Sequence, residues 1–465
     1  MTALSLPRPR RLRPLVILAA SLALVVGSQL APNLLPRAGA PSSAAQPPQT
    51  VAGPITAPDA PVTGAPGSLA TIDHSIAAWT INVEANARDY ISAANLGLLY
   101  EARARLSGDI SDYGRAEEAV TRSLAIEPRQ LDVQALHARL LFATHDFAKA
   151  LTEAQAIDRA APDQPALLAI MADARLELGD VDIASQLYAR INTLAPGPAV
   201  TARLARLAFL RGDPSAAVAG AEAANAAALA EGQAGPGLSW YAYLAGTLNL
   251  AAGSPDAAAT WYDRALSAWP GSFLALAGRA RAAAALGATE AAIAGYRAAI
   301  AVAPQPDALA ALGDLLALGG DTAGAEEQYA TVVAIAGLQG SGGGLVFNRQ
   351  LVLFDVNHGR DLATALTLAE HELAVRKDAY GYDAYAWALL ANGRAADADA
   401  AMTRALALGT RDATMLYHAG EIALALGDSA RAKDRLEAAL GIRGALDPLS
   451  VAKATASLAT LGLAR

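Results

Sequence analysis

The chain has 465 residues and a formal net charge of −8, and although 54% of its residues are hydrophobic, only 5% are aromatic. The hydrophobic share is therefore largely alanine and leucine, which are good helix formers. The chain contains no cysteine, which excludes disulfides, thiolate catalysis, cysteine metal sites and a lipidated cysteine.

Residues 1–35 predict an export signal or a single-pass membrane anchor. Four arginines between positions 8 and 13 precede an uncharged apolar run from Leu15 to Val26, which is the pattern of a signal peptide. The run reaches the roughly 20 residues of a spanning helix only if the polar residues that follow it are included. Cleavage after Ser28 and retention as an anchor within residues 15–35 both stay open. Either outcome predicts an extracytoplasmic protein (periplasmic, cell-surface or secreted), because the arginines remain inside.

Residues 36–68 predict a disordered linker. They are rich in proline, alanine, glycine, serine and threonine, and carry one acidic residue, Asp59, and one basic residue, Arg37. Such a segment cannot bury enough surface to fold, so we expect a semi-extended tether. Residues 69–89 then predict a leading helical segment.

Residues 90–447 are dominated by a repeat. An alanine recurs in steps of 33 or 34 residues, with one step of 41 and one of 40. These alanines are Ala116, Ala150, Ala184, Ala217, Ala258, Ala292, Ala325, Ala365, Ala398 and Ala432. Five residues before seven of them lies a glycine: Gly179, Gly212, Gly253, Gly287, Gly320, Gly393 and Gly427. Twelve residues after several of them lies a proline, as at Pro128 and Pro270. A period of this length fits one helical hairpin per unit.

Each recurring residue type has a mechanical reason. Glycine opens a tight turn at positive φ between antiparallel helices. The alanine then lies where a neighbouring helix comes close, and proline ends the second helix. Four residues after the alanine, a tyrosine fills the same position in four units, at Tyr188, Tyr262, Tyr296 and Tyr329. We interpret these tyrosines as packing between helices.

With this spacing the chain resembles the tetratricopeptide repeat (TPR) family over roughly residues 90–442. The resemblance is best in Gly246, Gly253, Ala258, Tyr262, Ala265, Leu266 and Pro270 and in Leu312, Gly313, Gly320, Ala325 and Tyr329. It implies an all-α solenoid, a right-handed superhelix of about ten helical hairpins. Residues 448–465 predict a C-terminal cap helix. The stretch around Trp387, Tyr417 and His418 further resembles exported bacterial TPR proteins, without implying any activity. The insert at 231–237 and the glycine run at 340–344 depart from the repeat.

The sequence shows few signs of catalysis or of metal, phosphate or nucleic-acid binding. No two of the six histidines have the spacing of a helical metal site, although Asp355, His358 and Asp361 could crowd around a cation at one turn. No phosphate-binding glycine motif or serine nucleophile elbow is present. Residues 69–465 carry 31 basic and 43 acidic residues, which argues against binding to nucleic acid. We therefore predict a protein that is not an enzyme and has no cofactor or metal.

The resemblance implies that the first helix of each hairpin lines a concave groove for a peptide or partner protein. The groove residues it implies are Arg206, Trp240, Tyr243, Arg281, Asp314, Tyr380, Asp383, Trp387, Tyr417 and Glu421. Earlier and neighbouring positions of the same series are Asp132, Arg139, Asp173 and Asp307. Mixed aromatic, basic and acidic side chains are typical of interaction hot spots. Two alternatives stay open: some of these aromatics pack between units, and the chain is an accessory subunit of, or itself, an enzyme of envelope polymers.

Overall fold

The computed structural model describes residues 68–340 and 348–463, and every regular element in these ranges is an α-helix. The predicted signal or anchor, nearly all of the linker and most of the glycine run lie outside the described residues. Among the described helices, none combines the length and the apolar character needed to cross a membrane. The predicted all-α fold is confirmed.

The first eleven helices are α1 (Leu69–Ala85), α2 (Tyr90–Ser107), α3 (Ser111–Ile126), α4 (Leu131–Ala143), α5 (Phe147–Ala160), α6 (Pro165–Glu177), α7 (Val181–Leu194), α8 (Pro198–Leu210), α9 (Pro214–Ala230), α10 (Gly235–Ala251) and α11 (Pro255–Ala268). The remaining eleven are α12 (Phe273–Ala285), α13 (Thr289–Val302), α14 (Pro306–Leu318), α15 (Thr322–Gly340), α16 (Asn348–Asn357), α17 (Leu362–Val375), α18 (Ala379–Ala391), α19 (Ala395–Ala405), α20 (Ala413–Ala425), α21 (Ser429–Gly441) and α22 (Pro448–Leu463).

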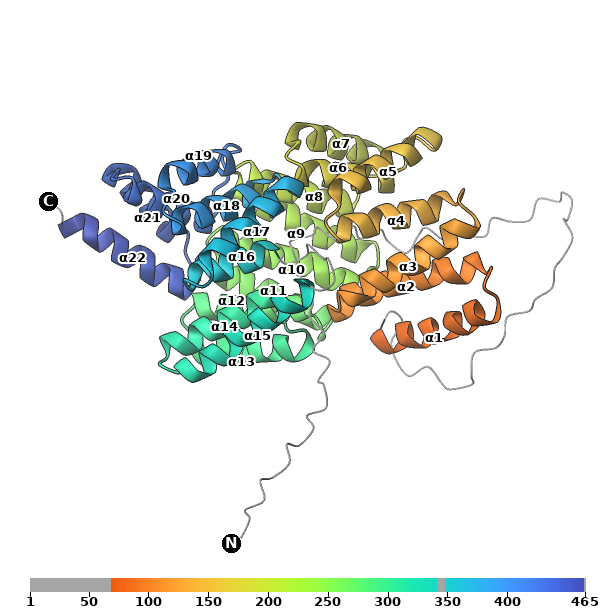
Figure 1. Cartoon of the computed structure of the whole chain (residues 1–465), viewed down its shortest axis with the longest axis horizontal. Coiled ribbons are helices and arrows are strands. Elements are labelled where there is room, and N and C mark those ends of the chain that lie inside the picture. The colour runs from red at the N-terminus through yellow and green to blue at the C-terminus, as the bar shows by residue number, and fades with distance from the viewer. Residues whose placement is uncertain (1–67, 341–347, 464–465) are drawn as a thin grey trace, which may run out of the picture.

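Helices α2 to α21 pair in chain order into ten hairpins, each packed on the next (Figure 1). Helix α1 packs on α2 at one end, and α22 packs on α21, α20 and α14 at the other. The recurrent alanines explain the close pairing. Nine of the ten are completely buried, and Ala325 is 2% exposed. A larger side chain at these positions would separate the two helices of a hairpin.

The seven turn glycines all have positive φ, as the repeat predicts. In the second unit His145 takes the same position at φ 67° and is buried against Phe147. The four recurrent tyrosines are also buried, which confirms their packing role. Tyr262 lies so close to Gly278 that a Cβ there would be 2.3 Å from the ring. Glycine on one helix therefore makes room for tyrosine on the neighbouring helix.

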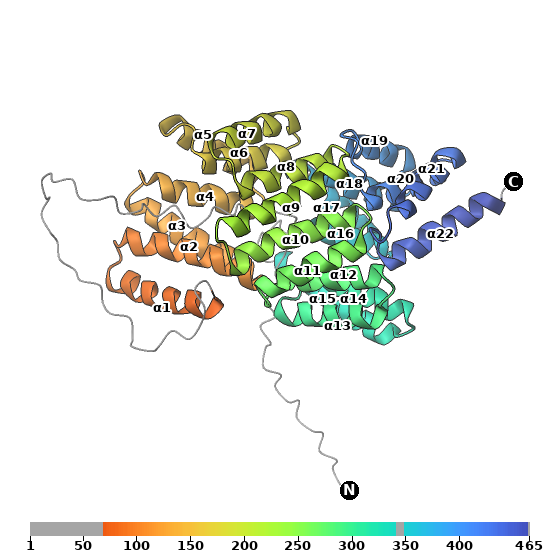
Figure 2. The ribbon, with the colours of Figure 1, turned by 180° about the vertical axis from the view of Figure 1, so that it is seen from behind.

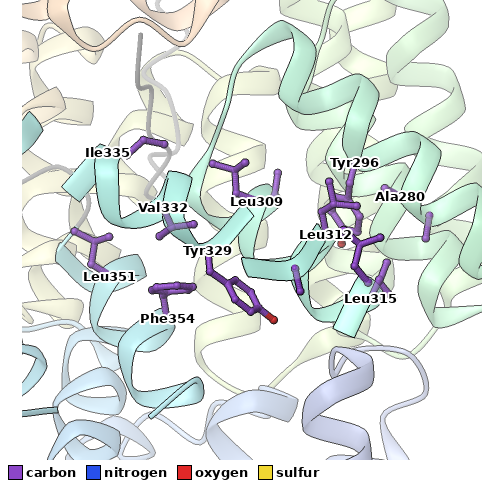
Figure 3. Close-up of a cluster of buried hydrophobic side chains, with 14 of the residues drawn as sticks. Ala280, Tyr296, Leu309, Leu312, Leu315, Tyr329, Val332, Ile335, Leu351 and Phe354 are labelled. Carbon is purple, nitrogen blue, oxygen red and sulfur yellow. The ribbon is translucent and has the colours of Figure 1, made fainter. Parts of the chain in front are cut away.

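The core runs continuously from unit to unit. Figure 3 shows one stretch of it, in which Tyr296, Leu312, Tyr329 and Phe354 belong to four successive helices of the stack, from α13 to α16. Such layered packing makes each unit depend on its immediate neighbours.

The stack also coils back on itself. Helices α16 to α18 lie across α8 to α10, in front of them in Figure 1 and behind them in Figure 2. The backbone N–H of Lys377 donates to the carbonyl of Glu177 at 2.9 Å, and the hydroxyl of Thr410 donates to the carbonyl of Leu210 at 2.6 Å. Units about 200 residues apart in the chain are therefore in direct contact.

Candidate functional site

The first helices of the N-terminal hairpins join one another through buried ion pairs. Arg139 on α4 donates to Glu101 on α2, and Arg203 on α8 donates to Asp173 on α6 with three bonds of 2.9–3.1 Å. Tyr188 adds a hydrogen bond to Asp173 at 2.8 Å. Burial acts to raise the pKa of Glu101, but the Arg139 guanidinium outweighs it and lowers that pKa. Arg139 and Asp173, predicted to line the groove, thus serve to connect units.

A larger network connects helices α6 and α8 with helices α16 to α18 on the opposite side of the coil. Arg206 on α8 donates to one oxygen of Glu177 at 2.9 Å, and Arg376, at the end of α17, donates to the other oxygen at 2.6 Å. Glu177 is 1% exposed. Burial acts to raise its pKa, but Arg376 and Arg206 outweigh it and hold the pKa well below its usual range. Glu177 is therefore a charged carboxylate shared between units on opposite sides of the coil.

Arg349, Glu372 and Asp378 extend this network. Arg349 donates to Asp378 at 2.8 Å and lies 3.8 Å from Glu372. Arg376 lies 3.7 Å from Glu372 and 3.6 Å from Asp378. The network therefore contains three guanidinium groups and three carboxyl groups, so its charges compensate within it. Sequence reasoning identified only Arg206 in this network, because its partners come from units far apart in the chain.

The predicted residues of α18 and α20 form a second, well-packed cluster. The Trp387 ring stacks on His418 with 4.1 Å between centroids, and its N–H donates to Asn357 at 2.8 Å. His418 donates to Asp383 at 2.8 Å, and Tyr417 packs against Trp387. Trp387 and Tyr417 are only 8% and 3% exposed. The structure thus places both rings in the packing between units.

Glu421 and Asp314 lie apart from these groups. Glu421 is half-buried, and burial raises its pKa, while Ser457 and Lys453 of α22 partly offset this rise. Asp314 accepts hydrogen bonds from Tyr329 and from His358, both at 2.7 Å. The second nitrogen of His358 contacts the Phe354 carbonyl at 2.6 Å.

The cation site considered at Asp355, His358 and Asp361 is therefore not formed, because both nitrogens of His358 have other partners. No group of three potential metal ligands occurs anywhere in residues 68–340 and 348–463.

Accessible groups gather on the first helices α10, α12 and α14. We call Trp240, Tyr243, Arg281 and Asp307 the inner patch. The two aromatic residues are half-buried, whereas Arg281 and Asp307 are exposed. Arg281 donates to the carbonyl of Ala445 at 2.8 Å, across the coil. Surrounding protein raises the pKa of Asp307 to about 6, although Arg281 partly opposes this rise. The patch combines aromatic surface with both signs of charge.

A cavity of ≈ 230 Å³ lies beside the inner patch, between α8, α10 and α12 on one side and α16, α18 and α20 on the other. Four of the predicted groove residues meet in its wall: Arg206, Arg281, Tyr380 and Asp383. Burial raises the pKa of Tyr380, and neighbouring Asp412 adds to this rise. The cavity exists because the coil closes, which the sequence alone does not show.

Comparisons with known proteins agree with this architecture. Residues 243–306 match the sequence model of the tetratricopeptide repeat family. No curated protein matches the chain significantly.

Three solved structures that resemble the chain are yeast Tom70, human IFIT1 and the Cut9–Hcn1 hetero-tetramer of the APC/C. Tom70 is 12% identical, with 84% of this chain and 93% of that chain covered and a TM-score of 0.36. IFIT1, solved as a dimer with PPP-AAAA, is 15% identical, with coverages of 80% and 86% and a TM-score of 0.42. The Cut9–Hcn1 structure is 14% identical, with coverages of 83% and 93% and a TM-score of 0.31. The match to the tetratricopeptide repeat model over residues 243–306 and the helical hairpins of the described residues together indicate an α-solenoid of the tetratricopeptide repeat type.

Proposed function

We propose that the chain is a non-catalytic scaffold that binds an extended segment of a partner protein at the inner patch. The observation that carries this proposal is the concentration of accessible aromatic and charged side chains on α10, α12 and α14. Most of the other predicted groove residues are taken up by ion pairs or by packing between units. Aromatic and arginine side chains in a partly desolvated surface are typical binding hot spots.

The charge of the patch supports a segment that carries polar groups of both signs. Tyr243, Arg281 and Asp307 lie close enough to influence one another electrostatically. Burial raises the pKa of Asp307, and Arg281 only partly offsets this rise. Arg281 donates to the Ala445 carbonyl, and among the described residues neither Asp307 nor Arg281 has an ion-pair partner within 4.0 Å. A partner that supplies a cation to Asp307 and an anion to Arg281 would satisfy both groups.

A displayed library of random peptides, selected on the immobilised full-length chain, tests this proposal. Binding of the enriched peptides should fall by roughly tenfold or more in Tyr243→Ala and in Arg281→Gln. The matched control is Arg297→Gln, which removes an exposed arginine from α13, the second helix of the same unit as α12. Peptides that bind all three variants equally would place the binding surface elsewhere.

We further propose that the repeats act outside the cytoplasm. The support is the arginine-rich start, the apolar run to Val26 and the tether-like composition of residues 36–68. Protease added to intact spheroplasts should digest the repeats of the full-length chain. A chain lacking residues 1–35 should stay protected. Protection of both chains would contradict the proposed location.

A further inference from the structure

The cavity contains two opposite charges that do not meet. Arg281 enters it from α12, and Asp412 enters it from the N-terminus of α20. Among the described residues, neither side chain has an ion-pair partner within 4.0 Å. The two groups attract each other, so the fold holds them apart against that attraction.

The remaining contacts of these two groups are with the backbone. Arg281 donates to the Ala445 carbonyl at 2.8 Å. One oxygen of Asp412 accepts from the backbone N–H groups of Thr414 and Met415 at 2.9 and 3.1 Å, which caps α20. Burial raises the pKa of Asp412, and the capping hydrogen bonds and Arg281 only partly offset this rise. Arg281 is also attracted by Asp447, but among the described residues neither Arg281 nor Asp412 has a direct ion-pair partner, so both keep hydrogen-bonding capacity.

The other charged groups of the cavity wall have nearby partners. Arg206 is paired with Glu177, and Arg349 with Asp378, at 2.9 and 2.8 Å. Asp383 accepts a hydrogen bond from His418 at 2.8 Å. Arg281 and Asp412 are thus the two charged groups of this wall that lack a charged or histidine partner among the described residues.

The rest of the wall sets the size and polarity of a suitable ligand. Phe209, Leu244, Leu248 and Leu353 are apolar residues of the same wall. The volume of ≈ 230 Å³ lies below the roughly 300–1,000 Å³ of pockets for drug-sized ligands. An anion alone would face Asp412 and Asp383, and a cation alone would face three arginines. A ligand that carries charges of both signs compensates both groups.

We propose that this cavity binds a small zwitterion with an apolar side chain, namely an apolar α-amino acid or a dipeptide. Its carboxylate pairs with Arg281, its ammonium group pairs with Asp412, and its side chain packs on the apolar residues of the wall. Charge-assisted hydrogen bonds at both ends would fix the orientation of the ligand. The cavity shares Arg281 with the inner patch, whereas Trp240, Tyr243 and Asp307 do not line it.

The test is titration calorimetry on the purified full-length chain. The probes are the twenty L-amino acids and the dipeptide Ala-Leu, each at up to about 10 mM, so that millimolar dissociation constants are measurable. N-acetyl-leucine lacks the ammonium charge and leucinamide lacks the carboxylate. At least one apolar zwitterion should bind, and the two singly charged analogues of leucine should bind roughly tenfold or more weakly than leucine.

Two variants assign the charges. Asp412→Asn keeps an effective N-cap residue for α20 but removes the charge, so leucine should lose its advantage over N-acetyl-leucine. In Arg281→Gln, leucine should no longer bind more tightly than leucinamide. Arg279→Gln is the control, since Arg279 lies on the same helix and pairs with Asp263 at the exposed surface. Circular dichroism establishes that each variant keeps its helices.

The outcomes separate cleanly. Failure of every zwitterion to bind the wild-type chain would overturn the proposal and leave the cavity filled with water. Binding that Asp412→Asn and Arg281→Gln leave unchanged would overturn it too, because the ligand would lie elsewhere. Neither result would bear on the peptide selection, which needs no small molecule.

Discussion

A Cβ atom on Gly212 would lie 2.2 Å from the carbonyl oxygen of Gly409. These two glycines belong to turns on opposite sides of the coil, and only the missing side chain of Gly212 allows the turns to touch. The same holds one unit earlier, where a Cβ on Gly179 would lie 2.8 Å from the Lys377 carbonyl oxygen. Gly287 occupies the same place in its own hairpin, yet nothing lies within 4 Å of its missing Cβ. The repeat glycine therefore allows the positive φ of its own turn in every unit that has it. In some units, such as those of Gly179 and Gly212, it also allows a distant turn to come close.

Gly212→Ala and Gly287→Ala separate these two functions. Their φ angles are nearly identical, at 77° and 78°, so both variants bear the left-handed strain of about 1–2 kcal/mol. Gly212→Ala should lose about 1–3 kcal/mol more, because its methyl group forces the two turns apart. Thermal unfolding measures the difference, and solution scattering should show a larger radius of gyration for Gly212→Ala alone. Equal effects of the two variants would mean that the turns do not touch in solution.

Glu177→Gln tests the buried network. Removing this carboxylate charge leaves Arg206 and Arg376 facing each other in a buried site, which should cost about 3–5 kcal/mol. Asp182→Asn is the control, since Asp182 is 94% exposed and lies 3.5 Å from Arg211. Its effect should stay within about 0.5 kcal/mol. If both substitutions had similar small effects, the contact of Glu177 with Arg376 across the coil would contribute little to stability in solution.

The repeat made much of the fold predictable, because it reflects contacts within a hairpin and between neighbours. Ala292 and Tyr296 lie where the 34-residue period puts them, both buried. The closing of the coil could not be predicted from the period. Glu177 and Arg376 are 199 residues apart, and nothing in one sequence indicates which distant units touch. Gly212 and Gly287 look identical in the sequence, and only the coil distinguishes them.

The candidate site was harder to predict for the same reason. Position in the repeat placed Arg206 and Trp387 on first helices, but it did not show that Glu177 and His418 would cover them. Arg281 was predicted at the groove and does remain accessible. Asp412 was not predicted at all, because it lies between units, and its acidic N-cap position resembles those of Asp146 and Asp213.

His137 predicts a dependence of stability on pH. Its two nitrogens contact Glu117 and Glu153 at 2.8 and 2.7 Å, and these hydrogen bonds raise its pKa to about 10. The folded chain therefore holds a proton that the unfolded chain releases near pH 6.5. The stabilisation is complete below about pH 6.5 and declines as the pH rises toward 10, by at most about 1.4 kcal/mol per pH unit.

His137→Gln should remove this decline, because glutamine can bond to one glutamate but does not titrate. Thermal unfolding midpoints of wild type and variant, compared across this pH window, measure the effect. The two proteins should differ most at pH 6.5 and converge toward pH 10. A constant difference would mean that His137 contributes through packing rather than through its charge.

Trp387→Ala and Tyr243→Ala distinguish packing from binding among the predicted groove aromatics. Trp387 is enclosed by His418, Tyr417 and Asn357, so its removal should cost about 3–5 kcal/mol of stability. Tyr243 is half-buried beside Tyr262, so its removal should cost less stability. If the inner patch is the binding surface, Tyr243→Ala should weaken the binding of selected peptides more than Trp387→Ala does. This comparison is made at a temperature where both variants are folded. Denaturant unfolding followed by circular dichroism measures the loss of stability, and peptide titration measures the loss of binding. If Trp387→Ala weakened peptide binding more than Tyr243→Ala while leaving stability unchanged, the partner surface would lie on α18 and α20, and the proposed patch would be wrong.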